Sequence, residues 1–374
     1  MIYKEFKGKK LSALGLGCMR FPTTEDKKID EAATEELFDY AMANGINYYD
    51  TAWMYHSGDS EIVTGKFLKK YPRDSYYIAT KFPGFDKDNM SKVEEIFEKQ
   101  LEKTGMEYFD FYLFHNVSEG NIDGYLSEEY GIFNYLMKQK ENGRIKHLGF
   151  SAHGNLDTLK RFLEKYGHAM EFGQLQINWL DYIAQNGKEK IELFTKYNIP
   201  VWVMEPVRGG RLVSIGDDYE AQLKTFRPEE SVPGWAFRFI QSLPEVCVTL
   251  SGMSNMEQLK DNIKTFSTDE PLNEKEFKTI LDIGVDMLKT NTLPCTGCEY
   301  CVEKCPMELD IPKIIKIYNG NCFTGSKKVN PGVVGSLPED KRPDACIGCQ
   351  ACEAVCPQNI KISEMMSDFA ERLK

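Results

Sequence analysis

The chain has 374 residues, of which 42% are hydrophobic and 28% charged, a composition typical of a globular protein with room for one large and one small domain. Its formal net charge of −11 disfavours a nucleic-acid partner, because the phosphate backbone carries charge of the same sign. The sequence lacks both an apolar run of about 18 residues and the apolar core of a signal peptide, so we expect no membrane partner and a cytoplasmic location.

Short apolar runs alternate with longer amphipathic runs over the first 285 residues. Residues 3–6 and 11–13 are expected to form a hairpin across the floor of the fold, with Gly8 in the turn. Eight candidate strands follow, over 14–19, 46–50, 76–81, 109–115, 147–151, 172–178, 199–205 and 246–251. Helical patterns between them cover 30–43, 91–103, 124–139, 156–166, 188–197 and 256–266.

Eight strands with helices between them predict an α/β fold, a parallel (β/α)8 TIM barrel. An open doubly wound sheet is the alternative, since it shows the same alternation of strands and helices. The alternative is disfavoured because the segment Gly15-Leu16-Gly17 lacks the third glycine of a GxGxxG phosphate loop.

Polar side chains stand at the carboxyl ends of three successive predicted strands, where such barrels place catalytic groups. Asp50 ends the second strand, Lys81 ends the third and His115 ends the fourth, while Tyr55 lies in the loop after Asp50. We expect Lys81 to lower the pKa of Tyr55, and Asp50 to keep Lys81 charged. His115 can then hydrogen-bond a substrate oxygen as charge develops on it. A purely structural ion pair of Lys81 with Asp50 is the alternative interpretation.

The pattern changes after residue 285, where eight of the eleven cysteines fall into two copies of the motif CxxCxxCxxxCP. Each cysteine of the second copy lies 51 residues after its counterpart in the first. This spacing is typical of bacterial ferredoxins with [4Fe-4S] clusters, in which the fourth cysteine of each run binds the other run's cluster. By that rule the two ligand sets are Cys295, Cys298, Cys301 with Cys356, and Cys346, Cys349, Cys352 with Cys305.

The cysteine runs therefore predict a small ferredoxin-like domain with two [4Fe-4S] clusters over residues 286–374, after a barrel over 1–285. Zinc usually binds paired CxxC knuckles, and disulfides need an oxidising compartment, so both are disfavoured. Cluster thiolates also favour the cytoplasm. Cys18 and Cys247 lie in apolar runs and are expected to be buried, whereas Cys322 receives no role. Short helices are expected at 312–318 and 363–373, and a loop at 324–343.

Several barrel motifs resemble the aldo-keto reductases: DTAWMY at 50–55, ATK at 79–81, FHN at 114–116 and LGFS at 148–151. With the cysteine runs, the whole chain is similar to the bacterial and archaeal members that carry a C-terminal iron–sulfur domain. The resemblance implies interconversion of a small carbonyl compound and its alcohol by hydride transfer from NADP or NAD. It also implies that Tyr55 is the general acid.

The resemblance further implies a set of nicotinamide cofactor contacts. Ser151 and Gln176 correspond to the residues that bind the carboxamide. The phosphate side corresponds to Gly209 and Gly210 after the seventh strand, and to Gly252 and Asn262 after the eighth. The family commonly has Ser-Asn after the fifth strand, where this chain has Ser-Ala, and Lys260 is the one cation near the expected 2′-phosphate position.

A nicotinamide transfers two electrons as hydride, whereas clusters transfer one at a time, and no flavin motif is apparent. We expect the clusters to exchange electrons with a ferredoxin or a flavoprotein. A reductase driven by its clusters without nicotinamide is one alternative. An electron-transfer subunit with a non-catalytic barrel is another.

Overall fold

The computed structural model describes residues 1–295, 297–323 and 328–374 of the chain. The chain divides into two compact units. The first comprises Met1–Gly209 and Pro233–Phe277, and the second comprises Gly210–Val232 and Lys278–Lys374. Helix α12 (Glu274–Asn291) runs through the expected boundary after residue 285, so the domain limits 1–285 and 286–374 remain a prediction.

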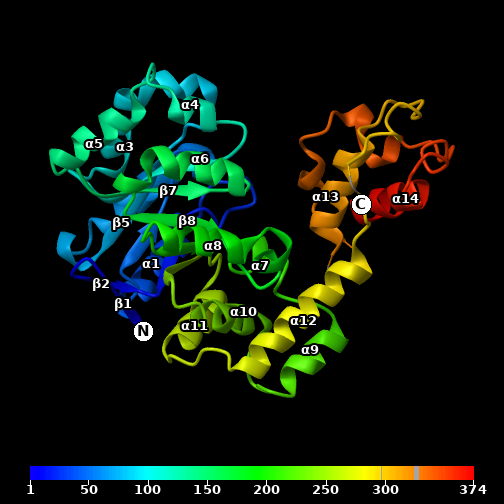
Figure 1. Ribbon diagram of the computed structural model, residues 1–374. Helices are drawn as coiled ribbons and strands as arrows, with labels where there is room; N and C mark the ends of the chain where they lie inside the picture. Colours follow the sequence, from blue (N-terminus) through cyan, green and yellow to red (C-terminus); the bar gives the residue numbers. More distant parts are fainter. Residues whose placement is uncertain (296, 324–327) are drawn as a thin grey trace. The chain divides into compact units, whose positions relative to one another are not determined.

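Eight parallel strands close into a barrel in the order β10-β3-β4-β5-β6-β7-β8-β9 (Figure 1). They are β3 (Leu14–Gly17), β4 (Tyr48–Asp50), β5 (Tyr77–Phe82), β6 (Phe109–Val117), β7 (Ile145–Ala152), β8 (Phe172–Gln176), β9 (Val201–Met204) and β10 (Val246–Ser251). Each strand overlaps one of the eight that the sequence predicts, so the predicted (β/α)8 barrel is confirmed.

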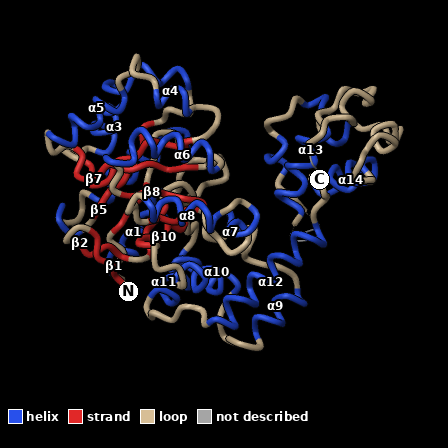
Figure 2. The backbone as a smooth tube through the Cα atoms, viewed as in Figure 1, coloured by secondary structure: helices blue, strands red, loops and turns tan. Residues whose placement is uncertain are grey.

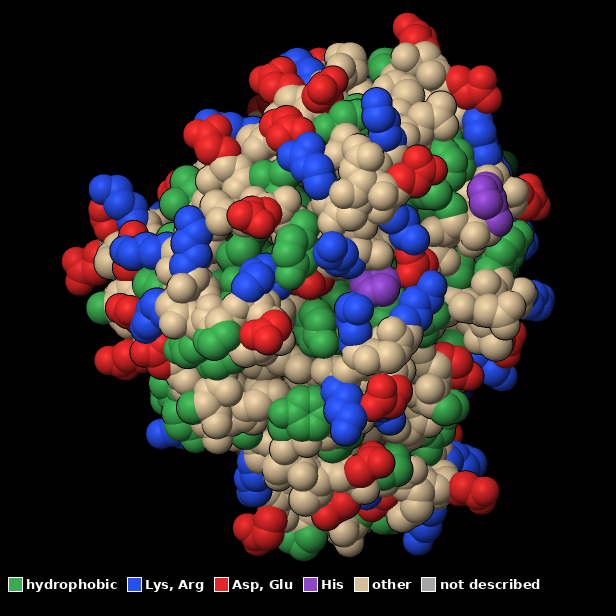
Figure 3. Space-filling view, turned by 90° about the vertical axis from the view of Figure 1, so that its left-hand side faces the viewer, with side chains coloured by type: hydrophobic (Ala, Val, Ile, Leu, Met, Phe, Trp, Pro, Cys, Tyr) green, Lys and Arg blue, Asp and Glu red, His purple; other side chains and the backbone are tan. Residues whose placement is uncertain are grey.

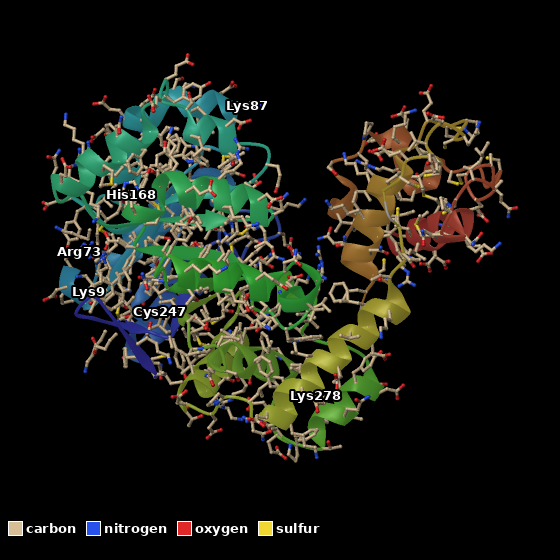
Figure 4. The ribbon with its side chains drawn as sticks, viewed as in Figure 1. Lys9, Arg73, Lys87, His168, Cys247 and Lys278 are labelled. Carbon is tan, nitrogen blue, oxygen red and sulfur yellow. The ribbon has the colours of Figure 1, made fainter. Side chains whose placement is uncertain are left out.

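An antiparallel hairpin of β1 (Tyr3–Phe6) and β2 (Lys9–Ser12) precedes the barrel, as predicted. Phe6 and Leu11 of the hairpin pack into a buried cluster with aromatic rings from the strands, including Phe111 and Trp202. Cys247 belongs to the same cluster and is buried, and Figure 4 labels it at the hairpin end of the barrel. This end is therefore a filled core, which leaves chemistry to the opposite end.

Helices surround the strands of the first unit (Figure 2). They are α1 (Glu31–Ala43), α2 (Ser60–Leu68), α3 (Val93–Thr104), α4 (Ile122–Leu126), α5 (Ile132–Glu141), α6 (Leu156–Tyr166), α7 (Asp181–Ala184), α8 (Gly187–Lys196), α10 (Val232–Gln241) and α11 (Met256–Phe266). Helices α1, α6 and α11 begin within one residue of their predicted starts. A side chain caps each of them, because Asp30, Asn155 and Asn255 each accept the N–H of the third following residue.

Two helical predictions need correction. The helix expected over 124–139 is two helices, α4 and α5, and Gly131 precedes the second in a left-handed conformation at φ 61°. Helix α2 was not predicted because seven of its nine residues are buried, which removes the polar face that marks an amphipathic helix. In α2, a Cβ on Gly65 would lie 2.0 Å from the Thr104 oxygen, so only glycine allows this approach to α3.

The second unit contains α9 (Asp217–Lys224), α13 (Ile311–Cys322) and α14 (Ile362–Arg372), with most of α12. Helix α13 contains the short helix predicted at 312–318, and α14 covers the one predicted at 363–373 except for its last residue. Their first residues, Ile311 and Ile362, are 51 positions apart, and both are buried in one apolar cluster. Of the loop expected at 324–343, residues 324–327 lie outside the described residues, and the remainder includes the single turns Pro331–Val334 and Glu339–Lys341.

Two further properties concern the helices and the charged side chains of the surface. Among the described residues, no helix combines the length and the apolarity needed to cross a membrane. On the face drawn in Figure 3, Lys and Arg side chains are interspersed with Asp and Glu side chains.

Candidate active site and cluster-binding cavities

The barrel gathers the four predicted catalytic residues at the carboxyl end of neighbouring strands. Asp50 is the last residue of β4, Lys81 lies one residue before the end of β5, and His115 lies near the end of β6. Tyr55 starts a single helical turn after β4. Because β4, β5 and β6 are consecutive parallel neighbours, these side chains share one end of the barrel.

Lys81 is the centre of this group. Its Nζ donates to Asp50 Oδ1 at 2.6 Å, to the Thr51 carbonyl oxygen at 2.8 Å and to Tyr55 Oη at 3.4 Å. An ammonium has three N–H donors, so each donor has an acceptor. The structure thus brings Asp50, Lys81 and Tyr55 into one hydrogen-bonded chain.

His115 lies beside this chain without being hydrogen-bonded to it. Its ring packs edge-on against Tyr55, with ring centroids 6.2 Å apart, and the Phe85 ring packs against it at 5.2 Å. Its Nδ1 is buried and has no hydrogen-bond partner among the described residues. Burial lowers the pKa of His115 well below its usual value, and the charge of Lys81 lowers it further. The imidazole is therefore neutral at neutral pH.

The expected fall in the pKa of Tyr55 does not occur. Burial raises this pKa above its usual value of 10.0, and Lys81 opposes the rise without reversing it. Burial also lowers the pKa of Lys81, but the charges of Asp50 and Tyr55 outweigh burial, so its pKa is raised. Tyr55 is thus a phenol and Lys81 an ammonium at neutral pH, which are the protonation states that a proton donor and its electrostatic partner need.

Ser151 and Gln176, the expected carboxamide ligands, lie near the ends of β7 and β8. The Ser151 oxygen accepts the N–H of Asn116 at 2.8 Å, which leaves the hydroxyl hydrogen able to donate. The Gln176 amide donates to Asp181 at 2.7 Å. Asp181 is fully buried and also pairs with Arg208 at 3.3 Å, so this network fixes Gln176.

The loop after β9 turns sharply at the expected phosphate-side glycines. Gly209 and Gly210 have φ angles of 64° and 89°, a conformation that glycine adopts readily. On the other expected segment, Gly252 follows β10, and a Cβ there would lie 3.2 Å from the Arg20 side chain. Asn262, buried in α11, donates to Ser251 Oγ at 3.0 Å, so its amide holds the end of β10.

Arg20 is a candidate site residue that sequence reasoning missed. Its side chain lies against Gly252, and its guanidinium lies 3.4 Å from Glu205 and 3.2 Å from where a Cβ on Gly209 would be. Arg20 therefore links the two segments expected to bind the phosphates. The sequence signal was its place after the first strand, at the catalytic end of the barrel.

Glu61 is a second residue that sequence reasoning missed. Its buried carboxylate accepts from Thr80 at 2.6 Å and from Gln100 at 2.7 Å, and it pairs with Lys103 at 2.7 Å. Gln100 also donates to the carbonyl oxygen of Lys81 at 3.0 Å. This network fixes the strand that carries the central lysine of the site. The available signal in the sequence was the acidic Glu61 within the largely apolar segment 60–68.

The second unit contains two cavities that hold the predicted cysteine sets. Cavity 1, with about 320 Å³ of empty space, is lined by Cys295, Cys298, Cys301 and Cys356. Cavity 2, with about 340 Å³, is lined by Cys305, Cys346, Cys349 and Cys352. Each cavity thus combines three cysteines of one run with the fourth of the other, the arrangement that the ferredoxin rule predicts.

The lining of each cavity fits a cubane cluster, because four cysteines are the ligands that a [4Fe-4S] cluster takes. Among the described residues, no three His, Cys, Asp or Glu side chains are placed to hold one metal ion. Burial, together with the neighbouring cysteines of each set, raises the pKa values of Cys301 and Cys352 to about 11. Bound iron would offset this cost, because a metal deprotonates the thiol that coordinates it.

Comparison with known proteins agrees with both parts. The model of the aldo/keto reductase family matches residues 13–284, and that of the 4Fe-4S dicluster domain matches residues 294–360. The barrel is similar to the structure of aldo-keto reductase AKR11C1 from Bacillus halodurans (holo form). That likeness has a TM-score of 0.63 and 23% identity, over 76% of this chain and 96% of the other.

Two curated relatives give the same result. Probable aldo-keto reductase 1 of Glycine max is 28% identical over 214 residues, which is 54% of this chain and 58% of that protein. The NADH-specific methylglyoxal reductase of Escherichia coli (strain K12) is 27% identical over 262 residues, which is 59% of this chain and 78% of that protein. Since the family model spans most of the sequence, the chain belongs to the aldo/keto reductase family, with a C-terminal 4Fe-4S dicluster domain.

Proposed function

We propose that this oxidoreductase is NAD(P)-linked and interconverts a small carbonyl compound and its alcohol at the carboxyl end of the barrel. The observation that carries the proposal is the hydrogen-bonded chain from Asp50 through Lys81 to Tyr55, with the neutral His115 beside it. This arrangement offers a proton donor, a fixed cation and a neutral hydrogen-bond donor around one space.

Each residue has a role in this proposal. The nicotinamide, when bound, supplies hydride. Tyr55 donates its phenolic proton to the substrate oxygen as a general acid, and Lys81 stabilises the phenolate that remains. Asp50 keeps Lys81 charged and oriented. The N–H of the neutral His115 ring hydrogen-bonds the substrate oxygen as its negative charge grows.

The cofactor contacts are proposed on the family pattern and on local geometry. Ser151 and Gln176 bind the carboxamide, and Gly209, Gly210 and Gly252 let backbone N–H groups approach the pyrophosphate. Arg20 adds a cation between these glycine segments. Asn262 supports the segment after β10 through Ser251.

We expect NADH to bind at least as tightly as NADPH. Lys260, the cation expected near the 2′-phosphate, lies 5.5 Å over the ring of Tyr40. Gln258, at an aligned position, accepts the Ser254 N–H at 2.8 Å and is neutral. A 2′-phosphate prefers fixed cations, whereas Lys260 is engaged with Tyr40 and Gln258 carries no charge. The Escherichia coli relative, named as NADH-specific, is consistent with this expectation.

The proposed role of the second unit is electron exchange. Cavities 1 and 2 would each hold one [4Fe-4S] cluster through their four cysteines. A cluster transfers one electron at a time, so two clusters together would hold two electrons for exchange with the partner, separately from the hydride that the nicotinamide supplies. The proposed partner is a ferredoxin or a flavoprotein.

Anaerobic purification followed by iron, sulfide, flavin and nicotinamide analysis tests the cofactor content. We expect eight irons and eight sulfides per chain, since four of each occupy each of two cubanes. Calorimetry with NADH and with NADPH then tests the barrel. If neither nucleotide binds, the nicotinamide part of the proposal is wrong.

Tyr55→Phe tests catalysis. We expect carbonyl reduction to fall by about 10²–10⁴-fold, the usual contribution of general acid catalysis, with NADH binding retained. Tyr108→Phe is the matched control, because Tyr108 immediately precedes β6 and so lies at the floor of the same barrel. Equal activities of the two variants would exclude Tyr55 as the acid.

A further inference from the structure

The two cluster-binding cavities differ in charge at one equivalent position. Glu299 follows Cys298 and lines cavity 1, and Gln350 follows Cys349 and lines cavity 2. These residues are 51 positions apart, the separation of the two cysteine runs. A carboxylate therefore stands in one copy of the repeat where an amide of nearly the same size stands in the other.

The backbone is the same at the two positions. Glu299 has a φ of 64° and Gln350 a φ of 60°, and the glycines two residues earlier, Gly297 and Gly348, have φ angles of 71° and 68°. Glu299 and Gln350 are both exposed, as are the cysteines that precede them. Because backbone conformation and exposure match at Glu299 and Gln350, the two loops differ at this position by one negative charge.

Other groups reinforce the asymmetry. Among the residues that the structure describes, Glu299 is the one charged side chain lining cavity 1, and the side chains lining cavity 2 are uncharged. At cavity 2, the N–H of Leu309 donates to Cys305 Sγ at 3.5 Å. Lys341 donates to the carbonyl oxygen of Met307, which lines cavity 2, at 2.9 Å. An N–H bond to sulfur and a nearby cation both favour an added electron.

One carboxylate near cavity 2 would oppose an added electron in that cavity. Glu353 follows Cys352, whereas Val302 follows Cys301 at the equivalent position of the first run. The Glu353 carboxylate accepts the Ser363 N–H at 2.8 Å and lies 3.9 Å from Lys361. The Ser363 N–H and the Lys361 ammonium thus offset part of its negative charge. Lys341 also has a carboxylate partner, Glu308, at 3.3 Å. Among the side chains that line the two cavities, in the part of the chain that the structure describes, Glu299 against Gln350 is the charge difference.

We propose that Glu299 makes the two clusters unequal: it lowers the reduction potential of the cluster in cavity 1 below that of the cluster in cavity 2. Reduction adds one electron to a cluster, and a neighbouring carboxylate opposes the added negative charge. An electron that enters the unit then comes to rest in cavity 2, with no proton transferred. The proposal rests on the two-cluster part of the proposed function and is independent of the nicotinamide chemistry.

Potentiometric titration followed by electron paramagnetic resonance tests the proposal on the full chain at one fixed pH. We expect two midpoints in the native protein. Glu299→Gln raises the lower midpoint and leaves the upper one, while Gln350→Glu lowers the upper midpoint and leaves the lower one. Because both side chains are exposed and screened, we expect about a three- to tenfold change in electron partition, where tenfold corresponds to about 59 mV. The shifts grow at low salt.

Glu303→Gln is the matched control. Glu303 is exposed in the same run, but it does not line cavity 1, so the same charge is removed from a different place. A shift for Glu299→Gln no larger than that for Glu303→Gln overturns the proposal, as does a shift of the upper midpoint instead of the lower. If Glu299→Gln does not assemble its clusters, Gln350→Glu decides alone. Native protein without iron and sulfide refutes the two-cluster assignment itself.

Discussion

Lys81 is a buried charge at the centre of the candidate active site. Its side chain is 1% exposed, and Asp50 is its charged partner. Removing one partner of a buried ion pair leaves the other unpaired away from water, so we expect Lys81→Met to lower the free energy of unfolding by about 3–5 kcal/mol. Lys81→Met combined with Asp50→Asn is expected to cost less than Lys81→Met alone. Urea unfolding measures both.

The ion pair of Lys66 with Glu31 provides the control, because both side chains are exposed. Lys66→Met is expected to change stability by about 0–1 kcal/mol, as exposed pairs do. A loss for Lys81→Met no larger than this would show that the buried pair is not stabilising. Such a result would favour a role for Lys81 in catalysis and not in stability.

Arg20 gives a second prediction at the residue scale. Its side chain is 45% exposed and pairs with Glu205. If Arg20 binds the pyrophosphate, we expect Arg20→Ala to weaken NADH binding about three- to tenfold, a discounted value because the site is partly solvated. Glu205→Gln should strengthen binding, because it releases the guanidinium. Calorimetry measures both affinities.

Arg161→Ala is the control for this prediction, since Arg161 is similarly exposed and pairs with Asp123 on the outer helices. It should leave the affinity for NADH unchanged. Equal affinities of the Arg20 and Arg161 variants would exclude Arg20 from the cofactor site.

Sequence reasoning predicted which candidate residues lie together better than it predicted their electrostatics. Asp50, Lys81 and His115 were predictable because strand ends are marked by the apolar pattern and catalytic groups gather there. The raised pKa of Tyr55 was not predictable from the sequence. Burial raises this pKa more than Lys81 lowers it, and burial depends on the packing of the folded chain. Arg20 was missed because it contacts segments about 190 and 230 residues away along the chain.

At the scale of elements, the strands were predicted and some helices were not. A buried strand shows as a short apolar run whatever surrounds it. Helix α2 is buried on nearly all sides and has no polar face to give the helical period. The break between α4 and α5 depends on the left-handed Gly131, which a periodic pattern does not show.

Glu171 joins the hairpin, α5 and the barrel floor. It pairs with Lys7 after β1 at 2.8 Å, with His147 of β7 at 2.8 Å and with Lys140 of α5. Burial alone would raise the pKa of Glu171, but these partners outweigh burial and lower it from 4.5 to about 2. A depressed carboxyl pKa stabilises the fold above the unfolded pKa, and the stability is lost as pH falls toward 2.

We therefore expect Glu171→Gln to cost about 2–3 kcal/mol at pH 7, and the difference from the native protein to shrink as pH falls from about 5 toward 3. Urea unfolding at several pH values measures this difference. Glu164→Gln, an exposed change on α6, is the control and should show no such trend. A cost for Glu171→Gln that does not vary with pH would contradict the assignment.

At the scale of the whole molecule, the two-part organisation was predictable and the membership of one segment was not. The residues of Gly210–Val232 come between β9 and α10 in the barrel repeat, yet they group with the second unit. Arg211 donates to the Gly320 oxygen at 3.4 Å, and Tyr219 donates to Asp286 at 2.6 Å. These contacts join residues 109 and 67 positions apart, and no local pattern reports such pairings.

Most cysteines of the crossed sets lie in or against the apolar core of the second unit, so we expect the proposed clusters to support its fold as well as to carry electrons. Cys301 and Cys352 belong to the same buried cluster as Ile311 and Ile362, the first residues of α13 and α14. Metal binding to such a site is coupled to folding. We therefore expect cluster removal by chelation to unfold α13 and α14 while the barrel stays folded, because the barrel has its own buried core. Circular dichroism should show a partial loss of helix, with NADH binding retained.

Two serine variants separate ligand loss from loss of a buried thiol. Cys305→Ser removes one ligand from cavity 2, so we expect about half of the iron to be lost together with stability of the second unit. Cys322→Ser changes a thiol that is also buried in this core but lines neither cavity, so it should keep its full iron content. Because Cys305 lies in the first run and its proposed cluster in the second, Cys305→Ser should disturb the loop around Cys346 and Cys349. Iron loss confined to cavity 1 would mean that each run binds its own cluster.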